Sequence, residues 1–439
     1  MAHGNRWIIV VVLLLVVSLV FNLGMLAYAA GASLLLLAIA RWLTMHWIHS
    51  LTATRDCNRL VAEIGDRVAV NVKVQNTSKL PIPWLLLEDL LPRRALAISP
   101  PSLDVQGTRI KLSMLRGRDA KVLAYQMDCN RRGYFQIGPL VLETGDLFGL
   151  FRRYRVGAEP VFLLVYPKVT PLEGFDLASR RPIGEVRMTY RLYEDPTRIA
   201  GVRQYEPGDS LNRVNWKATA RTGMLQSKVY EPSSVAGATL LLEFHTAEHD
   251  SAHEPYRSEL AVSAAASIAN ALYEVGQQFG LITNARDAAD RVRHEGWRGD
   301  MRTRQAARRS AAMLATSDRL RPIVLPAERG PEQLRRVLET LARVELTDGL
   351  DLAQLVSETT SRMPRDATVV AILPRVQVET AIVLGLLKKR GFAVSAIINT
   401  FDPNDFAAAS GPLLAQGIDT HHLRDETSIP TICRNFVLR

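Results

Sequence analysis

A long uncharged apolar stretch opens the chain. No charged residue lies between Arg6 and Arg41, an interval of about 34 residues. One straight helix of that length would measure roughly 51 Å, well beyond the ~30 Å hydrocarbon core of a bilayer. The turn-compatible residues of Asn22–Gly24 interrupt the stretch near its middle. The pattern therefore predicts an N-terminal transmembrane helical hairpin over residues 1–50, with two short spans at Trp7–Phe21 and about Met25–Leu43.

The charges that flank this hairpin predict its orientation. Arg6 lies at the start of the first span, and Arg41 and Arg55 lie at or beyond the end of the second. Positive charge at both outer ends and none in the turn places both ends on the cytoplasmic side. We expect a multi-pass protein of the cell inner (plasma) membrane, with cytoplasmic soluble domains and membrane lipid among its partners. Two alternatives remain open. One is a cleaved secretory signal ending near Ala27–Ala29, although the next ten residues stay apolar, and the other is a re-entrant hairpin.

Alternation of apolar and polar residues predicts strands in the next part of the chain. Between about Leu60 and Val169 the period is mostly two, and it is clearest in Val68–Val74. The other expected strands are Lys121–Met127, Leu140–Glu143 and Val161–Val165. Turn signals recur between them, so we expect residues 51–170 to form an antiparallel β-sandwich domain.

From about Ala238 the pattern changes to short apolar strands that alternate with amphipathic helices. The expected strands are Thr239–Phe244, Phe279–Thr283, Thr368–Leu373 and Phe392–Asn399. The expected helices are Ser258–Val275, with Ser258 as its N-cap, and Val376–Arg390, which Gly391 ends. Alternating βα units are typical of a doubly wound, largely parallel sheet covered on both faces. We expect this α/β architecture for residues 236–439 and a junction segment over 171–235.

Composition narrows the class of protein. Of the 439 residues, 22% are charged and 47% are hydrophobic, which argues against wholesale disorder and against a polytopic transporter. The 54 Lys and Arg residues exceed the 44 Asp and Glu residues, for a net charge of +10. Cys57, Cys129 and Cys433 are isolated, so we expect packing roles for them and no disulfide framework.

An Arg-rich stretch, Arg286–Arg309, is a candidate for contact with nucleic acid or anionic lipid. Trp297 is its only aromatic residue, whereas a stacking platform for single strands needs aromatic residues among the cations. The simpler interpretation is a solvated insertion loop. We therefore expect no nucleic acid among the partners.

Residues 201–221 hold the densest set of candidate binding residues. Pro207-Gly208 suits a type II turn, Asp209 or Ser210 would cap a short helix, and Gly223 would release the chain into a strand at Leu225–Tyr230. The candidates for binding are Arg203, Tyr205, Gly208, Asp209, Arg213, Asn215, Trp216, Lys217 and Arg221. They would form an anion site or a protein-docking surface. Alternatively, Tyr205 and Trp216 belong to a core, and Asp209 pairs with an arginine.

Two sequence motifs carry a resemblance to a known family. One reads Arg-x-Tyr-x-x-Gly-Asp over Arg203–Asp209, followed by Arg-x-Asn-Trp-Lys-Ala-Thr-Ala-Arg over Arg213–Arg221. The other comprises Arg132–Pro139 and, further along, Gly145–Leu150. The two motifs, in their order along the chain, resemble those of the domain of unknown function 58 family. The resemblance covers essentially the whole chain, including the apolar hairpin.

The resemblance implies a bacterial, membrane-anchored protein whose C-terminal domain is similar to a von Willebrand factor A domain. Members of the family are commonly linked with MoxR-type AAA+ ATPases and sometimes with transglutaminase-like membrane proteins. The implied role is a non-catalytic adaptor or assembly factor that works with the ATPase in the cell envelope or in protein maturation. No reaction is established for the family, so the resemblance supplies none.

Most residues of a von Willebrand-type metal site are replaced in this sequence. Such a site needs Asp-x-Ser-x-Ser after the first strand, where oxygen ligands suit Mg²⁺. The corresponding Glu243–Ala247 lacks both serines, and Leu373–Arg375 places a cation where a carboxylate would help. His245, His249 and His253 have the spacing of a Zn²⁺ or Ni²⁺ face on a helix, but loop residues separate them. We expect a polar surface loop there, with no metal and no cofactor.

Other catalytic motifs are absent from the sequence. It contains no Walker-type phosphate loop, no Gly-x-Gly-x-x-Gly after a strand and no Gly-x-Ser-x-Gly elbow. The leading hypothesis is therefore a non-catalytic adaptor. The alternative is an enzyme of unknown reaction that uses Asp209, Lys217 and Arg221 at the domain junction as an acid–base set.

Overall fold

The computed structural model describes residues 2–172, 194–205, 214–232, 237–290, 320–364 and 367–432. These residues form two compact units. The first contains residues 2–168, 286–290 and 338–347. The second contains residues 169–172, 194–205, 214–232, 237–285, 320–337, 348–364 and 367–432. The division into four segments, with boundaries after residues 50, 170 and 235, stays a prediction.

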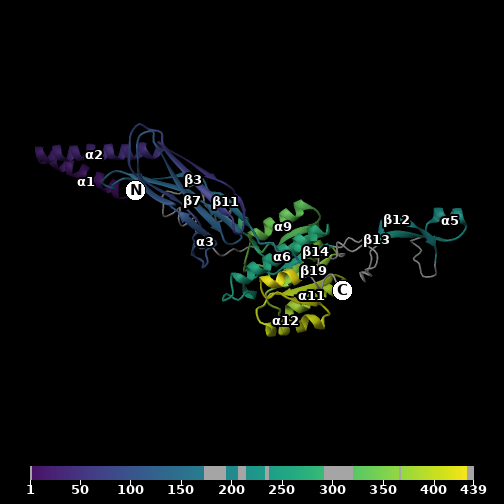
Figure 1. Cartoon of the computed structure of the whole chain (residues 1–439). Coiled ribbons are helices and arrows are strands. Elements are labelled where there is room, and N and C mark those ends of the chain that lie inside the picture. The colour runs from purple at the N-terminus through teal and green to yellow at the C-terminus, as the bar shows by residue number, and fades with distance from the viewer. Residues whose placement is uncertain are drawn as a thin grey trace. The chain divides into compact units, whose positions relative to one another are not determined.

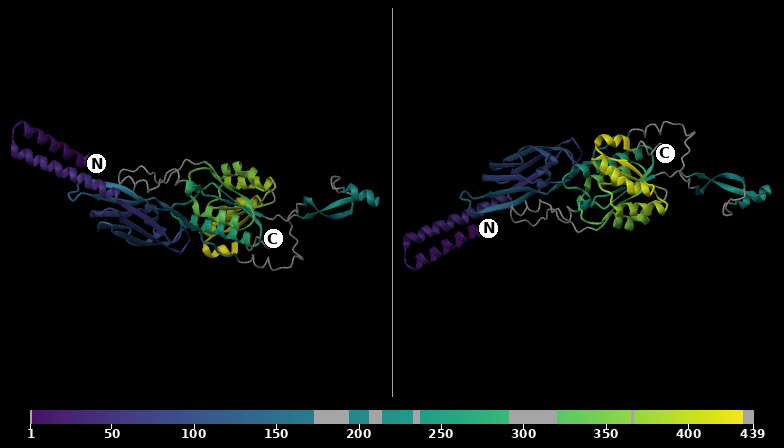
Figure 2. Two further views of the ribbon diagram at one scale, coloured as in Figure 1. Left: turned by 90° about the horizontal axis from the view of Figure 1, so that it is seen from above. Right: turned by 90° about the horizontal axis from the view of Figure 1, so that it is seen from below.

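Two apolar helices begin the first unit, as the hydrophobic pattern predicts (Figures 1 and 2). Helix α1 spans Ala2–Val20 and helix α2 spans Gly24–His49. A short turn joins them, in which Asn22 has a φ of 52°. Helix α2 continues six residues past the end expected at Leu43, because Trp47 and Ile48 pack into the core of the sheets that follow.

Helix α2 is the candidate membrane anchor. Within the described residues it is the one helix that is long and apolar enough to cross a bilayer, and its 26 residues measure roughly 39 Å. Helix α1 adds a shorter apolar segment, Arg6–Val20. Large apolar side chains on both helices, such as Leu13 and Leu36, are exposed. Exposed apolar surface of this extent is typical of helices that face lipid.

Sheets make up most of the rest of the first unit. Their strands are β1 (Leu51–Cys57), β2 (Val61–Glu63), β3 (Arg67–Asn76), β4 (Ile82–Asp89), β5 (Leu103–Gly107), β6 (Ile110–Leu115), β7 (Ala120–Cys129), β8 (Gly133–Ile137), β9 (Leu140–Gly145), β10 (Arg152–Ala158) and β11 (Val161–Tyr166), with helix α3 (Arg93–Ala97) between β4 and β5. The strand orders are β1-β3-β7-β5, β10-β9-β4-β6 and β2-β11-β8. The four expected strands are confirmed as β3, β7, β9 and β11. Pairing is antiparallel except between β2 and β11, which run parallel.

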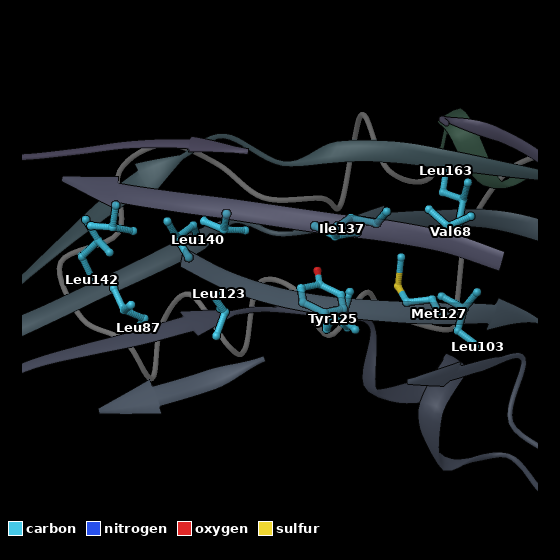
Figure 3. Packing of buried hydrophobic residues seen from close by; sticks show 14 of the residues in the cluster. Val68, Leu87, Leu103, Leu123, Tyr125, Met127, Ile137, Leu140, Leu142 and Leu163 are labelled. Carbon is cyan, nitrogen blue, oxygen red and sulfur yellow. The ribbon is translucent and has the colours of Figure 1, made fainter. Parts of the chain in front are cut away.

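These sheets share one hydrophobic core, which the alternation of apolar residues explains (Figure 3). In β3 the valines from Val68 to Val74 are completely buried at every second position. Leu87 from β4, Leu123 and Met127 from β7, and Leu140 from β9 belong to the same cluster. Side chains of a strand point to alternate faces, so a period of two places one whole set in the core.

Arg132, the first residue of the motif Arg132–Pro139, is buried and caps a helix end within the first unit. Its Nη1 donates to the carbonyl oxygens of Leu341 at 2.9 Å and Val344 at 2.8 Å. Leu341 lies in the last turns of helix α9 (Pro331–Arg343) and Val344 in β18 (Val344–Glu345), which pairs antiparallel with β16 (Arg286–Asp287). The arginine thus satisfies carbonyl groups that the helix leaves without partners.

A six-stranded, largely parallel sheet dominates the second unit. Its strands are β14 (Gly237–Leu242), β15 (Gln278–Thr283), β17 (Ile323–Glu328), β19 (Thr368–Leu373), β20 (Ala393–Ile398) and β21 (Asp419–His422). Their order is β17-β15-β14-β19-β20-β21. The edge strand β17 is antiparallel to β15, and the other pairs are parallel. The four expected strands are confirmed as β14, β15, β19 and β20.

Helices cover both faces of this sheet (Figure 1). They are α6 (Tyr256–Glu274), α9, α10 (Leu352–Thr359), α11 (Val378–Lys389), α12 (Pro403–Ala415) and α13 (Ile429–Ile432), with 3₁₀ turns at Thr246–Glu248, Thr360–Arg362 and Glu426–Ser428. Helices α10, α11 and α12 share one core with Leu241 and Val369 of the sheet, while α6 contacts β14, β15 and β19. Gly391 follows α11 with a φ of 96°, as expected. Ser258 as N-cap is wrong: α6 begins after Pro255, and the Ser258 hydroxyl donates to Glu254.

Candidate functional site

The described residues of the segment 201–221 lie on a two-stranded hairpin and a short helix. Strand β12 (Glu194–Gln204) pairs antiparallel with β13 (Gln226–Pro232). Just beyond β12, the Tyr205 N–H donates to the Leu225 carbonyl oxygen at 2.9 Å, and Tyr205 is half-buried. The Arg203 guanidinium donates to the carbonyl oxygen of Gln204 at 3.1 Å. Three candidates, Gly208, Asp209 and Arg213, lie outside the described residues, as do the turn expected at Pro207-Gly208 and the cap expected at Asp209 or Ser210.

The short helix α5 (Trp216–Thr222) carries the other signature residues. Asn215 is its N-cap, because the Asn215 side-chain oxygen accepts from the Ala218 N–H at 3.2 Å. Gly223 ends the helix with a φ of 70°, in the left-handed region that favours glycine. Sequence reasoning identified Gly223 but missed Asn215 as a cap. An asparagine directly before a run of helix formers was the available signal.

Helix α5 buries none of its residues. The Trp216 side chain is 69% exposed, and the Met224 and Leu225 side chains that follow the helix are exposed too. Lys217 and Arg221 are exposed and lie four residues apart, so they are neighbours on the helix surface. An apolar anchor beside two cations suits docking of a partner better than chemistry, since tryptophan and arginine are enriched at protein interfaces.

A second candidate site lies at the carboxyl edge of the six-stranded sheet. Strand β14 lies between β15 and β19. Of the strands that follow it in sequence, β15 and β17 lie on one side, and β19, β20 and β21 lie on the other. Ligands bind at such a switch point in many open α/β sheets. Glu243 follows β14 and is buried. Its Oε1 accepts from the Asn284 amide at 2.8 Å and from the His245 N–H at 3.1 Å. The Asn284 side chain also accepts from the Phe244 N–H at 2.7 Å, so this edge is bound into a compact network.

The three histidines that follow β14 do not share a helix face. A 3₁₀ turn at Thr246–Glu248 separates His245 from His249, and α6 begins only at Tyr256. The expectation of a polar surface loop is wrong for His249, whose side chain is 1% exposed. Its Nδ1 lies 2.7 Å from Glu254 Oε1, and its ring meets Phe244 edge-on. Within the described ranges, no group of three or more His, Cys, Asp or Glu side chains is arranged to hold a metal ion.

Burial raises the pKa of Glu243 above its ordinary value of 4.5, although the hydrogen bonds from Asn284 and His245 oppose that shift. A raised pKa means that the folded state binds the proton more tightly. The stability that Glu243 contributes is therefore complete at acidic pH and is lost as the pH rises through the folded pKa.

We expect Glu243→Gln to remove this loss. The side-chain oxygen of the glutamine would still accept hydrogen bonds from the Asn284 amide and the His245 N–H, and it would bring no charge into the buried site. Hydrogen exchange of peptides from β14 and β15 across a pH series measures the effect. The wild-type chain should lose protection relative to the variant as the pH rises above about 4.5, after correction for intrinsic exchange. Parallel pH profiles for the two chains would contradict the assignment.

The two cysteines in the described residues are buried or partly buried. Cys129 is buried, and burial raises the pKa of its thiol to about 11. Cys57 is partly buried, and burial raises its pKa as well. A raised thiol pKa lowers the thiolate fraction and with it the reactivity. Cys433 lies outside the described residues.

The Arg-rich stretch is described only at its beginning. Arg286 is buried and forms part of β16, so it does not belong to a solvated loop. Residues 291–309 lie outside the described residues, so the insertion loop expected there stays a prediction.

Comparison with known proteins identifies relatives. Residues 201–308 match the model of a family described as protein of unknown function DUF58. The chain is 24% identical over 241 residues to the uncharacterized protein YeaD of Bacillus subtilis (strain 168). That alignment covers 54% of this chain and 57% of YeaD, so the chain matches just over half the length of this relative.

Solved structures resemble the chain only loosely. The CARDB domain of PF1109 from Pyrococcus furiosus is 13% identical with a TM-score of 0.18, over 26% of this chain and 86% of that domain. Proximal thread matrix protein 1 from the mussel byssus is 9% identical with a TM-score of 0.25, over 46% of each chain. Likenesses this weak carry no argument about fold or function. The match over residues 201–308, which include the signature residues on β12 and α5, instead supports the assignment of this segment to the DUF58 family.

Proposed function

We propose that this protein is a membrane-anchored, non-catalytic adaptor that works with a MoxR-type AAA+ ATPase in the cell envelope or in protein maturation. The observation that carries the proposal is the exposure of Trp216 on a helix that buries nothing, inside the segment that matches the family model. A transglutaminase-like membrane protein is a further partner in the same proposal.

The proposal includes two membrane spans in the inner membrane, with both ends cytoplasmic. The length and apolar surface of α2 support the anchor, and the short apolar segment of α1 is the second span. Arg6 at the outer end of α1 and Arg41 near the end of α2 support the orientation.

The proposal also assigns the two soluble domains. The shared core of the antiparallel sheets supports a β-sandwich over the region between α2 and residue 170. The parallel strands around a central β14, with helices on both faces, support a von Willebrand factor A-like domain. In that domain Glu243 takes the place of the first metal-binding aspartate and is held by Asn284, which suits a packing role.

Replacement of Trp216 by alanine should weaken capture of the ATPase by about 30-fold, because a buried tryptophan anchor is typically worth about 2 kcal/mol or more at an interface. The full chain, solubilised in detergent, is immobilised and titrated with a MoxR-type ATPase from the same source, with ATP, with ADP and without nucleotide. Dissociation constants of the wild-type chain and the variant are compared.

A charge-reversal pair supplies the matched control. Lys217→Glu with Arg221→Glu should weaken capture, whereas Lys389→Glu with Arg390→Glu, on exposed positions within and after α11, should leave it unchanged. If no nucleotide condition gives capture by the wild-type chain, the adaptor function is wrong. If both charge-reversal pairs weaken capture equally, binding depends on net charge and not on α5.

A further inference from the structure

The turn between β9 and β10 displays two large apolar side chains. Leu147 is 77% exposed and Phe148 is 81% exposed, and apart from α1 and α2 no large apolar side chain in the described residues is more exposed. The turn is held in place from beneath. The buried Asp146 carboxylate accepts from the Phe148 N–H at 3.1 Å and from the Phe151 N–H at 2.6 Å. The hydrogen bonds of Asp146 therefore fix the turn in which Leu147 and Phe148 are exposed, within the Gly145–Leu150 motif.

Contacts within the first unit place this turn beside the end of α2. Arg155 of β10 donates to the carbonyl oxygens of Ile48, His49 and Leu51 at 3.1–3.3 Å. Just beyond the end of β10, the carbonyl oxygen of Glu159 accepts from the Arg55 guanidinium of β1. Strands β1 and β10 thus run in the same direction, and the residues before Arg155 extend toward the side from which α2 arrives.

The height of the turn along α2 follows from strand and helix dimensions. Three residues of strand, from Arg155 back to Arg152, span about 10 Å, which equals six or seven residues of helix. Counted back from His49, that reaches roughly Trp42, an exposed aromatic residue near the end of the apolar run. Helix α2 lies beside both β9 and β10, and Leu43 packs on the core of the sheets. The turn is therefore level with the end of the hydrocarbon-facing part of α2.

Cations surround the same end of the sheets. Lys79, Arg116 and Arg118 are exposed on the loops next to Ser50, where the Thr77 N–H donates to the Ser50 carbonyl oxygen at 2.9 Å. Arg152 is exposed at the base of the turn, 3.9 Å from Glu143. Exposed Leu and Phe with a rim of Lys and Arg are the combination that binds the interface of an anionic bilayer.

We propose that Leu147 and Phe148 insert into the headgroup region of the membrane that α2 crosses, while the surrounding cations contact anionic lipid. This second attachment, which rests on the proposed anchoring by α2, fixes the first unit against the bilayer. Without it the unit would be tethered only through the end of α2.

Single-cysteine labelling of the full chain tests both attachments separately. In a background with Cys57→Ser, Cys129→Ala and Cys433→Ser, an environment-sensitive fluorophore is placed at Phe148→Cys, at Leu36→Cys in α2 or at Leu60→Cys. Leu60 is an exposed leucine beyond the opposite end of β1 and is the matched control. Each chain is reconstituted into vesicles of phosphatidylcholine and phosphatidylglycerol that contain a nitroxide quencher at a shallow or a deep position.

We expect the label at position 36 to be quenched most by the deep nitroxide, the label at 148 most by the shallow nitroxide, and the label at 60 by neither. Quenching at 36 without quenching at 148 would overturn the insertion of the turn and leave the anchor intact. Absence of quenching at 36 would overturn the proposed anchor itself. Blue-shifted emission at 148 without quenching would assign the turn to a protein contact and overturn the proposal.

The lipid dependence tests the cations. In vesicles of phosphatidylcholine alone, quenching at 148 should fall, whereas quenching at 36 should not change. A companion chain with the label at Leu147→Cys and the substitution Phe148→Asp should lose most of the shallow quenching. Unchanged quenching in either experiment would contradict the proposed contact.

Discussion

Replacement of Asp89 by alanine should destabilise the first unit by about 3–5 kcal/mol, because it would leave a buried arginine without its partner. The Asp89 side chain is completely buried and the Arg55 side chain is 2% exposed. The Arg55 guanidinium binds both Asp89 carboxylate oxygens, and its Nε lies 3.2 Å from Asp89 Oδ2. The Tyr125 hydroxyl donates to the same Oδ2 at 2.7 Å.

Tyr125 makes the cost of this substitution larger. Figure 3 shows its ring among the apolar side chains of the core. Burial, reinforced by the negative charge of Asp89, raises the pKa of Tyr125 far above its usual value, so the hydroxyl stays protonated and needs an acceptor. In the Asp89→Ala variant the hydroxyl would lose its acceptor, and the guanidinium would lose the carboxylate and keep only the carbonyl oxygen of Glu159.

Hydrogen exchange of peptides from β3 and β7, in the detergent-solubilised full chain, measures the opening free energy of this unit alone. Arg67→Gln is the matched control, since it removes an exposed ion pair with Asp128 on the same strands and should change protection little. Arg55→Met, Asp89→Leu and Tyr125→Phe combined should restore most of the stability, because an apolar replacement leaves no unpaired group. Equal effects of Asp89→Ala and Arg67→Gln would refute the prediction.

The sequence was sufficient where burial alone determines local structure. Thr368–Leu373 was predicted as a strand and is β19 with the same bounds, because its continuous apolar run from Val369 is typical of a strand covered on both faces. In β3 the valines alternate with polar residues, which indicates a strand with one buried face. Neither inference needs knowledge of the neighbouring strands.

Prediction failed where a residue depends on a distant partner. Strand β17 was not among the expected strands. Its sequence contains Pro326, and proline is tolerated in a sheet mainly at an edge. That β17 is an edge strand follows only from its pairing with β15. His249 was expected in a polar surface loop because loop residues separate the three histidines. Its burial depends on Glu254 and Phe244, which the fold brings together.

The residues of the candidate site could be predicted from the sequence, but the exposure of their side chains could not. The motif identified Trp216, Lys217 and Arg221, and left open whether the tryptophan belongs to a core. Its 69% exposure is a property of the folded hairpin, since the seven residues of α5 contain no second large apolar side chain to pack beside it. A single short motif cannot encode that outcome.

Replacement of Phe244 by alanine should destabilise the second unit by about 3–5 kcal/mol, the usual cost of removing a fully buried phenylalanine. Phe244 is completely buried at the carboxyl edge of the sheet, directly after Glu243. Its N–H donates to the Asn284 side chain at 2.7 Å, and its ring meets the buried His249 edge-on. Truncation would leave a cavity beside a carboxyl group and an imidazole, and it would remove the ring that the imidazole meets edge-on.

Hydrogen exchange of peptides from β14, β15 and β19 would report this loss, while peptides from β3 in the other unit should be unaffected. Phe244→Leu should cost less than alanine, because more of the volume is filled. Val378→Ala, at an exposed position of α11, should stay within about 0.5 kcal/mol of the wild-type chain.

The Phe244→Ala variant also separates two roles for the edge of this sheet, packing and contact with the partner. If the loop after β14 serves packing, Phe244→Ala should weaken capture of the ATPase only in proportion to the unfolded fraction. Loss of capture at full protection would instead show that the edge itself contacts the partner.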